Sequence, residues 1–293
     1  MPTLPPEHSP DSARESHQAR ELAESFGSDP DRYDRARPRY PEAMVDAIVA
    51  ASPGLDVVDV GIGTGIAARQ FRAAGCRVLG VEVDARMAQW ARQQGFEVEV
   101  AAFEAWDPAG RIFDAVISGQ TWHWVEPVGG AAKAAEALRP GGRLAAFWNA
   151  GQPPTELAQA FAEVYRRVAP DSLAARWATA AAQDAYSMPH QKVVDGIRAA
   201  GGFGDPEEWR FDWERSYTRD EWLDHLPTTG GHAQFSAATQ DAVLVGVGAA
   251  IDAAGGSFPV RFTTTVVTAV LREGHDRHLE DHLRPGGYVT GSK

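Results

Sequence analysis

The sequence has little cysteine, few basic residues and no long apolar segment. Its 293 residues include one cysteine, Cys76, which excludes an internal disulfide and fits a reducing compartment. Lys and Arg number 28 against 40 Asp and Glu, so the formal net charge is −12. Duplex nucleic acid repels such a surface unless a basic patch offsets it, and the sequence shows no such patch. We therefore expect no nucleic-acid partner.

The sequence also lacks features of membrane proteins, secreted proteins and metal sites. No stretch approaches the ~20 apolar residues that span a bilayer. The polar, Pro-rich N-terminus lacks the apolar segment of a signal peptide. We expect a cytoplasmic protein with no membrane partner. We predict no metal site, since the histidines near the C-terminus lie among acidic residues in a terminal segment. Nothing in the sequence indicates an oligomeric state.

What the sequence does contain is an alternation of short apolar runs and helix-length segments. Expected strands are 55–60, 77–83, 96–101, 112–118 and 143–149, and expected helices between them are 65–75, 84–95 and 128–142. Such an alternation predicts right-handed βαβ units in a parallel sheet. Further strands are expected at 207–218 and 259–271. The predicted fold class is α/β, with a Rossmann-like, seven-stranded, mostly parallel sheet and helices on both faces.

The domain organisation follows from composition. Residues 1–24 offer little apolar surface, so we predict a disordered or loosely helical arm there. Residues 25–273 form one predicted domain because no Pro/Gly/Ser-rich linker divides them. Helical insertions within about 150–206 and 219–257 are expected to cap the ligand edge of the sheet. Residues 274–293 are expected to be a flexible tail.

A glycine-rich turn follows the first expected strand. The segment "VVDVGIGTGIAAR" places Gly61, Gly63 and Gly65 between a strand and a helix, where glycine lets the backbone approach a ligand closely. Read from Gly63, the dinucleotide pattern G-x-G-x-x-G ends on Ala68, a permitted variant, so the spacing leaves a dinucleotide open. Asp59, at the strand end, suits a cationic amino group better than a pyrophosphate.

These residues carry a resemblance to a known family. "DVGIGTG", followed by an acidic residue seventeen positions after Gly65 in "VLGVEVDARM", resembles the first two motifs of class I S-adenosylmethionine-dependent methyltransferases. Upstream, "YDRARPRYP" (33–41) resembles a segment found in a trans-aconitate methyltransferase-like branch of the type 11 group. The resemblance covers residues 25–150 well and continues diffusely to about 272. It implies S-adenosylmethionine as cofactor, S-adenosylhomocysteine as product, and methyl transfer to a small-molecule acceptor at a carboxylate or hydroxyl oxygen.

The resemblance also implies roles for particular residues. Asp59 would orient the methionyl ammonium group, and Glu82 would accept hydrogen bonds from both ribose hydroxyls. Ala102 departs from the family pattern, because many relatives carry an aspartate there that accepts a hydrogen bond from the adenine amino group. Asp84 is expected to cap a helix. The full set of predicted cofactor-binding residues is Tyr33, Arg37, Asp59, Gly61, Gly63, Gly65, Glu82, Val83, Met87, Phe103, Glu104 and Gln120.

The loop "SGQTWHWVEP" (118–127) leaves the fourth expected strand at its carboxyl end, where ligands bind in such sheets. His123 is the candidate catalytic residue, as a general base for a hydroxyl acceptor. The preferred interpretation is that His123 forms a structural or cofactor-facing wall. Tyr33 and Arg37 could equally dock an N-terminal helix. Predicted substrate-pocket residues are Trp122, Trp124, Trp148 and His232.

Two other functions remain open at this point. A nicotinamide-dependent oxidoreductase would share the glycine-rich turn and the acid after the second strand. An S-adenosylmethionine-binding protein without methyl transfer would share all the cofactor residues.

Overall fold

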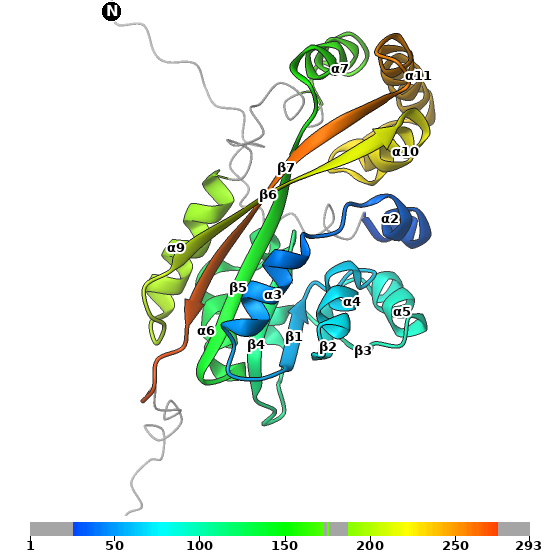
Figure 1. The fold of residues 1–293 in the computed structure, drawn as a ribbon. Coiled ribbons are helices and arrows are strands. Elements are labelled where there is room, and N and C mark those ends of the chain that lie inside the picture. The colour runs from blue at the N-terminus through cyan, green and yellow to red at the C-terminus, as the bar shows by residue number, and fades with distance from the viewer. Residues whose placement is uncertain (1–25, 173–174, 176–186, 275–293) are drawn as a thin grey trace, which may run out of the picture.

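The computed structural model describes residues 26–172, 175 and 187–274, and its centre is one twisted sheet (Figure 1). The strand order is β3-β2-β1-β4-β5-β7-β6. β7 pairs antiparallel with both of its neighbours, and the other pairings are parallel. This confirms the Rossmann-like, seven-stranded, mostly parallel sheet. The strands are β1 (Asp56–Val60), β2 (Arg77–Glu82), β3 (Glu97–Val100), β4 (Phe113–Gly119), β5 (Leu138–Gln152), β6 (Glu207–Thr218) and β7 (Ser257–Val270).

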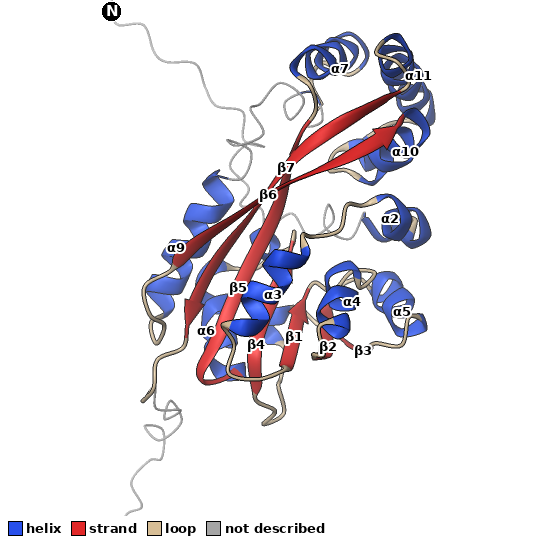
Figure 2. Ribbon diagram, in the orientation of Figure 1, coloured by secondary structure: helices blue, strands red, loops and turns tan. Residues whose placement is uncertain are grey.

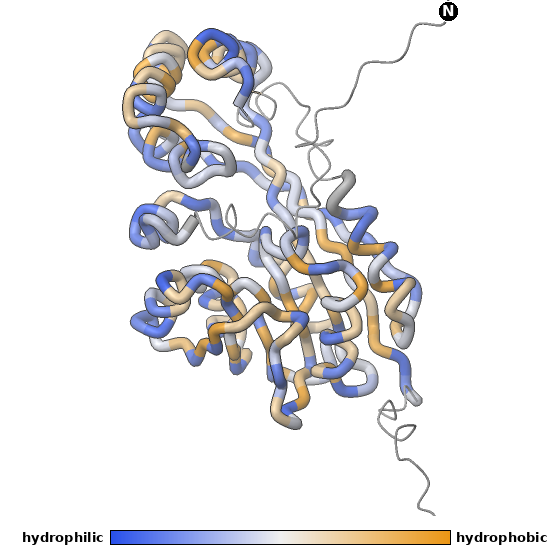
Figure 3. Tube along the Cα trace, turned by 180° about the vertical axis from the view of Figure 1, so that it is seen from behind, coloured by the Kyte–Doolittle hydropathy of each residue, from blue (hydrophilic) through white to orange (hydrophobic). Residues whose placement is uncertain are grey.

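Helices cover both faces of the sheet (Figure 2). One face carries α3 (Glu42–Ala50), α4 (Ile66–Ala73) and α5 (Ala85–Gln93). The other carries α6 (Pro127–Ala137) and α9 (Ser187–Ala200), whose Val193 and Ile197 belong to that core. Apolar residues run along the strands, whereas the helices alternate between hydrophobic and hydrophilic positions (Figure 3). That distribution is expected of parallel strands buried on both faces.

The two helices that begin near the ligand edge of the sheet have acidic N-cap residues. The Asp84 carboxylate accepts a hydrogen bond from the Arg86 backbone N–H at 2.9 Å, so the predicted cap of α5 is confirmed. Glu126 caps α6 through the N–H groups of Val128 and Gly129. Asp84 follows the end of β2 directly, whereas Glu126 follows β4 after the short loop that carries His123.

The boundary between α6 and β5 differs from the prediction. The expected helix over 128–142 ends at Ala137, and β5 begins at Leu138, opposite Phe113 of β4. Pro140 explains the early end, because a proline disfavours helical geometry at the residue before it. The ladder between β4 and β5 has a register shift between Phe113 and Ala115.

The last three strands in the order continue beyond the parallel part of the sheet and carry a cap (Figure 1). Gly151 of β5 pairs with Phe262 of β7, which in turn faces Trp213 of β6. Three helices pack on this extension in a second core that includes Tyr165 and Tyr217. They are α7 (Thr155–Val168), α10 (Arg219–His225) and α11 (Ala237–Ala253).

Not every helix in the expected insertions belongs to the cap. α7, α10 and α11 do, whereas α9 packs against α6 on the sheet. The predicted arm at 1–24 lies outside the described residues, as does the predicted tail apart from Gly274. Within the described ranges, none of the helices is both long enough and apolar enough to span a bilayer.

Candidate functional site

The turn after β1 is held in a conformation that favours glycine. Gly61, Gly63 and Gly65 have φ values of +68°, +56° and +87°. A Cβ at Gly61 would lie 2.1 Å from the Thr121 Cγ2, so this position also lacks space for a side chain. A Cβ at Gly63 would meet only the Gly61 carbonyl oxygen, at 4.0 Å. The backbone at Gly63 therefore faces open space that a ligand can enter.

Two carboxylates end the first two strands beside this turn. Asp59 is 1% exposed, and its Oδ2 has no hydrogen-bond partner among the described residues. Burial and the nearby Glu82 carboxylate raise the pKa of Asp59 well above its ordinary value. The buried Glu82 accepts hydrogen bonds from the N–H of Gly63 at 2.8 Å and of Asp84 at 2.9 Å. Burial raises the pKa of Glu82 despite these hydrogen bonds. A cationic group placed here would favour the ionised form of both.

The segment 30–41 is anchored over the glycine-rich turn. It begins with α2 (Pro30–Ala36), and Asp34 pairs with Arg69, which also donates a hydrogen bond to the Thr64 carbonyl. The Tyr40 backbone makes two hydrogen bonds with the Gln70 side chain. Arg69 and Gln70 lie on α4, which directly follows the glycine-rich turn. The helix α4 therefore holds both this segment and the turn in place.

Tyr33 and Arg37, both predicted to bind the cofactor, lie together in this segment. The Arg37 guanidinium is 4.9 Å from the centre of the Tyr33 ring. It also donates a hydrogen bond to the carbonyl of Thr228, in the short 3₁₀ helix η6 (Leu226–Thr228) of the cap. Arg37 therefore connects the segment to the cap.

The loop after β4 closes the other side of the turn. Gln120 has a φ of +58°, which is uncommon for a residue other than glycine. Its backbone N–H donates to the Phe147 carbonyl at 2.8 Å, and its side-chain amide donates to the Asn149 carbonyl at 3.2 Å. Thr121 Oγ1 lies 3.1 Å from the Gly119 carbonyl oxygen, which it hydrogen-bonds. The loop is thus fixed to the end of β5.

His123 lies in the 3₁₀ helix η5 (Trp122–Trp124), and its ring has a defined tautomer. The indole N–H of Trp148 donates to the His123 Nδ1 at 3.1 Å. Since the indole can only donate, Nδ1 carries no proton and the neutral ring holds its proton on Nε2. Burial lowers the pKa of His123 to about 4. At neutral pH the ring offers a donor at Nε2, while its acceptor is already occupied.

Three predicted site residues have their side chains in the core between the sheet and α6. Phe103 is 2% and Trp122 1% exposed, and their rings lie 5.9 Å apart. Both side chains pack in the core between the sheet and α6, and their contact with a ligand stays a prediction. Trp148, 1% exposed, packs there too, and its indole N–H donates a hydrogen bond to His123 in the loop. Sequence spacing does not show which way a side chain points at a strand end.

Three further predicted cofactor residues lie after β2 and β3. Met87 is buried in α5, and Val83 is half-buried before that helix. Glu104 accepts a hydrogen bond from the Glu126 backbone N–H at 2.5 Å, which joins the loop after β3 to the start of α6. Trp124 is half-buried, with its ring 4.7 Å from that of His123.

His232 lies in the cap, away from the His123 loop. It is 2% exposed, and its Nε2 lies 2.7 Å from the hydroxyl of Tyr165 in α7. Burial lowers the pKa of His232 to about 4 and raises that of Tyr165. This predicted pocket residue therefore forms a buried polar contact within the cap.

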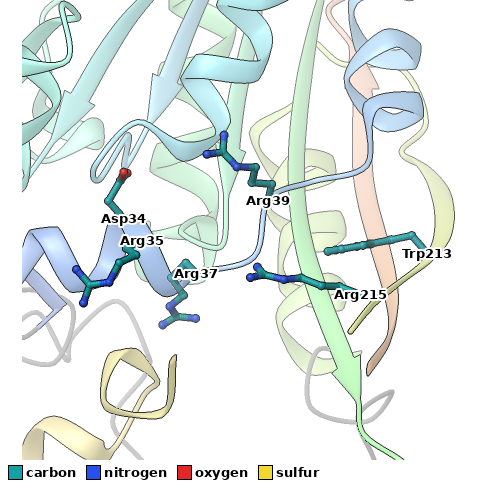
Figure 4. A pocket seen from close by; sticks show the side chains of 6 residues that line it. All are labelled: Asp34, Arg35, Arg37, Arg39, Trp213 and Arg215. Carbon is teal, nitrogen blue, oxygen red and sulfur yellow. The ribbon is translucent and has the colours of Figure 1, made fainter. Parts of the chain in front are cut away.

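A polar pocket of about 480 Å³ lies between the segment 30–41 and β6. Figure 4 shows Trp213 and Arg215 extending from β6 towards the segment that carries Arg37 and Arg39. A pocket at this place was not predicted from the sequence. Its signal was the run of alternating arginines in "DRARPR" within an acidic chain. The lining residues are Asp34, Arg35, Arg37, Arg39, Trp213 and Arg215.

Comparisons with known proteins agree with this geometry. A family model described as a methyltransferase domain matches residues 58–146. A malonyl-(acyl-carrier protein) O-methyltransferase of Enterobacter lignolyticus is 30% identical over 193 residues, covering 59% of this chain and 77% of that protein. This chain belongs to the class I S-adenosylmethionine-dependent methyltransferases. The predicted family and cofactor are thereby confirmed, and a nicotinamide-dependent oxidoreductase is set aside.

Two other relatives found by sequence cover less of this chain, whereas one solved structure covers more. Uncharacterised methyltransferases of Mycobacterium tuberculosis and Mycobacterium bovis are 33% identical over 138 residues, covering 44% of this chain. The match spans 54% of those proteins, about half their length. A solved structure from Anaeromyxobacter dehalogenans, assigned as a type II methyltransferase, is 20% identical and covers 80% of this chain and 98% of its own. Its TM-score of 0.59 shows the shared fold.

The residues at the strand ends fit the family's cofactor. S-adenosylmethionine carries an ammonium group, two ribose hydroxyls and a sulfonium. The unpartnered Oδ2 of Asp59 suits the ammonium, and the two oxygens of Glu82 suit the hydroxyls. The open space at Gly63 allows the ligand to reach the backbone.

Proposed function

We propose that this methyltransferase transfers the methyl group of S-adenosylmethionine to a carboxylate or hydroxyl oxygen of a small-molecule acceptor. The observation that carries this proposal is the buried, unpartnered Oδ2 of Asp59 beside Glu82 and the open backbone of Gly63. A buried carboxylate without a partner is costly, and a bound ammonium group removes that cost. An enzyme that binds this cation gains a positioned methyl donor.

When bound, the cofactor supplies an electrophilic methyl group on a sulfonium with a neutral thioether as leaving group. The chain's own contribution is therefore positioning and exclusion of water. Asp59 and Glu82 hold the two polar ends of the donor, and the glycine-rich turn keeps the backbone close. The loop from Gln120 to Trp124 and the cap cover the acceptor side.

A carboxylate acceptor fits the histidines better than a hydroxyl does. Hydroxyl attack gains from a general base near the working pH, by about 10²–10⁴-fold. His123 has its acceptor nitrogen engaged by Trp148, and His232 is paired with Tyr165 in the cap. A carboxylate is already ionised at neutral pH and needs no base. We therefore assign His123 to the wall of the site rather than to proton removal.

The relatives support an oxygen acceptor without identifying it. One relative is named as an O-methyltransferase that acts on a malonyl group carried by a protein. The "YDRARPRYP" segment supports membership of the trans-aconitate-like branch, which we retain as a proposal. We also propose a cytoplasmic location and a free small-molecule acceptor in place of a carrier-bound one.

Calorimetric titration with S-adenosylhomocysteine tests cofactor binding, and an acceptor panel tests transfer. We expect saturable binding by the wild-type protein and much weaker binding by Asp59→Asn, which removes the charge but keeps the shape. Absence of saturable binding would refute the proposed function. Binding without methyl product over carboxylate and hydroxyl acceptors would favour a protein that uses the cofactor without methyl transfer.

A further inference from the structure

We infer that the pocket lined by Arg37, Arg39, Arg215 and Trp213 binds an anionic group of the methyl acceptor, a carboxylate or a phosphate. The statement that this anion belongs to the methyl acceptor rests on the proposed function. The geometry of the pocket carries the preference for an anion. Guanidinium groups are the side chains best suited to hold carboxylate or phosphate oxygens by paired hydrogen bonds.

The charges around the pocket do not cancel. Four arginines and one acid line it, and the acid, Asp34, is paired with Arg69 at 2.6 Å. Arg35 is paired with Asp31 and Asp224 and contributes little net charge. The remaining guanidinium groups concentrate positive charge in a protein whose net charge is −12. A local concentration of this kind attracts and orients anions.

The arginines of the pocket differ in the contacts that their guanidinium groups make with the rest of the protein. Arg39 is exposed, and no ion pair or hydrogen bond of its guanidinium appears among the described residues. Arg215 lies 4.4 Å from the Tyr217 ring centre, and its ion pair with Glu221 is 3.6 Å long. Both can therefore turn towards an incoming anion at low cost.

Trp213 gives the pocket an apolar side. One side of its ring stacks on Phe262 at 4.4 Å, and its indole N–H donates to Thr264 Oγ1 at 2.8 Å. The ring is therefore rigid and its polar atom is satisfied, so the surface left for a ligand is apolar. A ligand with an anionic head and a flat apolar body matches this combination.

The pocket adjoins the cofactor residues through short connections. Asn149, at the far end of β5, donates to the Arg39 carbonyl at 3.1 Å and accepts at its own carbonyl from the Gln120 amide. Asp34 reaches the glycine-rich turn through Arg69. An anion held here lies beside the ligand edge of the sheet, which is where an acceptor must be anchored.

Titration of three matched probes into the full-length protein tests the inference, with and without saturating S-adenosylhomocysteine. The probes are phenylacetate, phenyl phosphate and neutral phenylacetamide. Arg39→Gln and Arg215→Gln each remove one cation, and Arg210→Gln removes an exposed arginine from β6 that does not line the pocket. We expect at least one anion to bind, with affinity about tenfold weaker in either pocket variant, equal to about 1.4 kcal/mol. The Arg210→Gln control should bind as the wild type does.

The outcomes separate this inference from the proposed function. Stronger binding of phenylacetate indicates a carboxylate-bearing acceptor, and stronger binding of phenyl phosphate indicates a phosphorylated one. Equal binding of phenylacetamide, or unchanged anion affinity in both pocket variants, overturns the inference. If anions bind in an arginine-dependent way but S-adenosylhomocysteine does not bind, the anion pocket stands and the methyl-transfer function fails. Unchanged S-adenosylhomocysteine affinity in the variants shows that they remain folded.

Discussion

Replacing His123 tests whether this ring is a neutral wall or a base. The substitution His123→Asn places an amide oxygen near the position of the imidazole Nδ1, so the hydrogen bond from the Trp148 indole is kept. It removes the only titrating group of that contact. His123→Leu is the matched control, since it leaves the buried indole N–H without a partner at a cost of about 1–3 kcal/mol.

The magnitude follows from the pKa of His123. It is about 4 in the folded protein, because the ring is buried, against an ordinary value of about 6.5. The unfolded chain therefore binds the proton first as the pH falls, and the folded state loses stability between about pH 6.5 and pH 4. From pH 7 to pH 5 this one ring contributes a loss of at most about 2 kcal/mol.

Urea unfolding at pH 7 and pH 5, followed by circular dichroism, measures this loss. The free energy of unfolding should fall by about 1–2 kcal/mol more in the wild type than in His123→Asn, because the other titrating groups are shared. An equal fall in both proteins would mean that the ring titrates normally and is not buried. A large loss of turnover in His123→Asn at unchanged S-adenosylhomocysteine affinity would instead identify His123 as a base and refute the tautomer argument.

Two further predictions concern the cofactor residues. Gly63→Ala should lower the free energy of unfolding by about 1–2 kcal/mol because of its positive φ alone. Gly61→Ala should lower it further because the new Cβ would meet the Thr121 side chain. Urea unfolding compares the two variants, and equal losses would contradict the contact with Thr121. Glu82→Ala should weaken S-adenosylhomocysteine binding by about 1.5–3 kcal/mol in calorimetry, because a charged acceptor is lost, and an unchanged affinity would place the ribose elsewhere.

The sheet and the glycine-rich turn could be predicted because their signals are local. Each βαβ unit spans adjacent segments, so apolar runs, caps and glycine spacing identify it without knowledge of distant partners. The turn at Gly61, Gly63 and Gly65 is an example, since three positive φ angles demand glycine wherever the chain then goes. Asp84 as the cap of α5 was predictable for the same reason.

The length of the last strands was not predictable, because it depends on pairing between distant residues. β5 was expected to end at 149, and the residues after it, "AGQ", carry no strand preference. In the structure they pair with β7 through Gly151 opposite Phe262 and Gln152 opposite Arg261. The partner strand supplies the hydrogen bonds that the local sequence does not indicate.

The directions of the side chains at the strand ends could not be predicted from the sequence either. Trp122 and Trp124 flank His123 symmetrically in the sequence, yet Trp122 is buried in the sheet core and Trp124 is half-buried. The Trp122 ring packs against Phe103, whereas the Trp124 ring lies beside that of His123. The Phe103 ring also points into the core, where it stacks with the ring of Trp106.

The extension of β6 explains how one strand serves both the acceptor pocket and the cap. Trp213, Arg215 and Tyr217 alternate with exposed residues and so share one face. The first two line the pocket, and Tyr217 is fully buried in the cap core between α10 and the start of β7. A shift in cap packing at Tyr217 must therefore move Arg215, two residues away on the same rigid strand. Asp59 and Glu82 lie on β1 and β2, which do not pair with β6. A substitution of Tyr217 should thus lower acceptor affinity more than S-adenosylhomocysteine affinity.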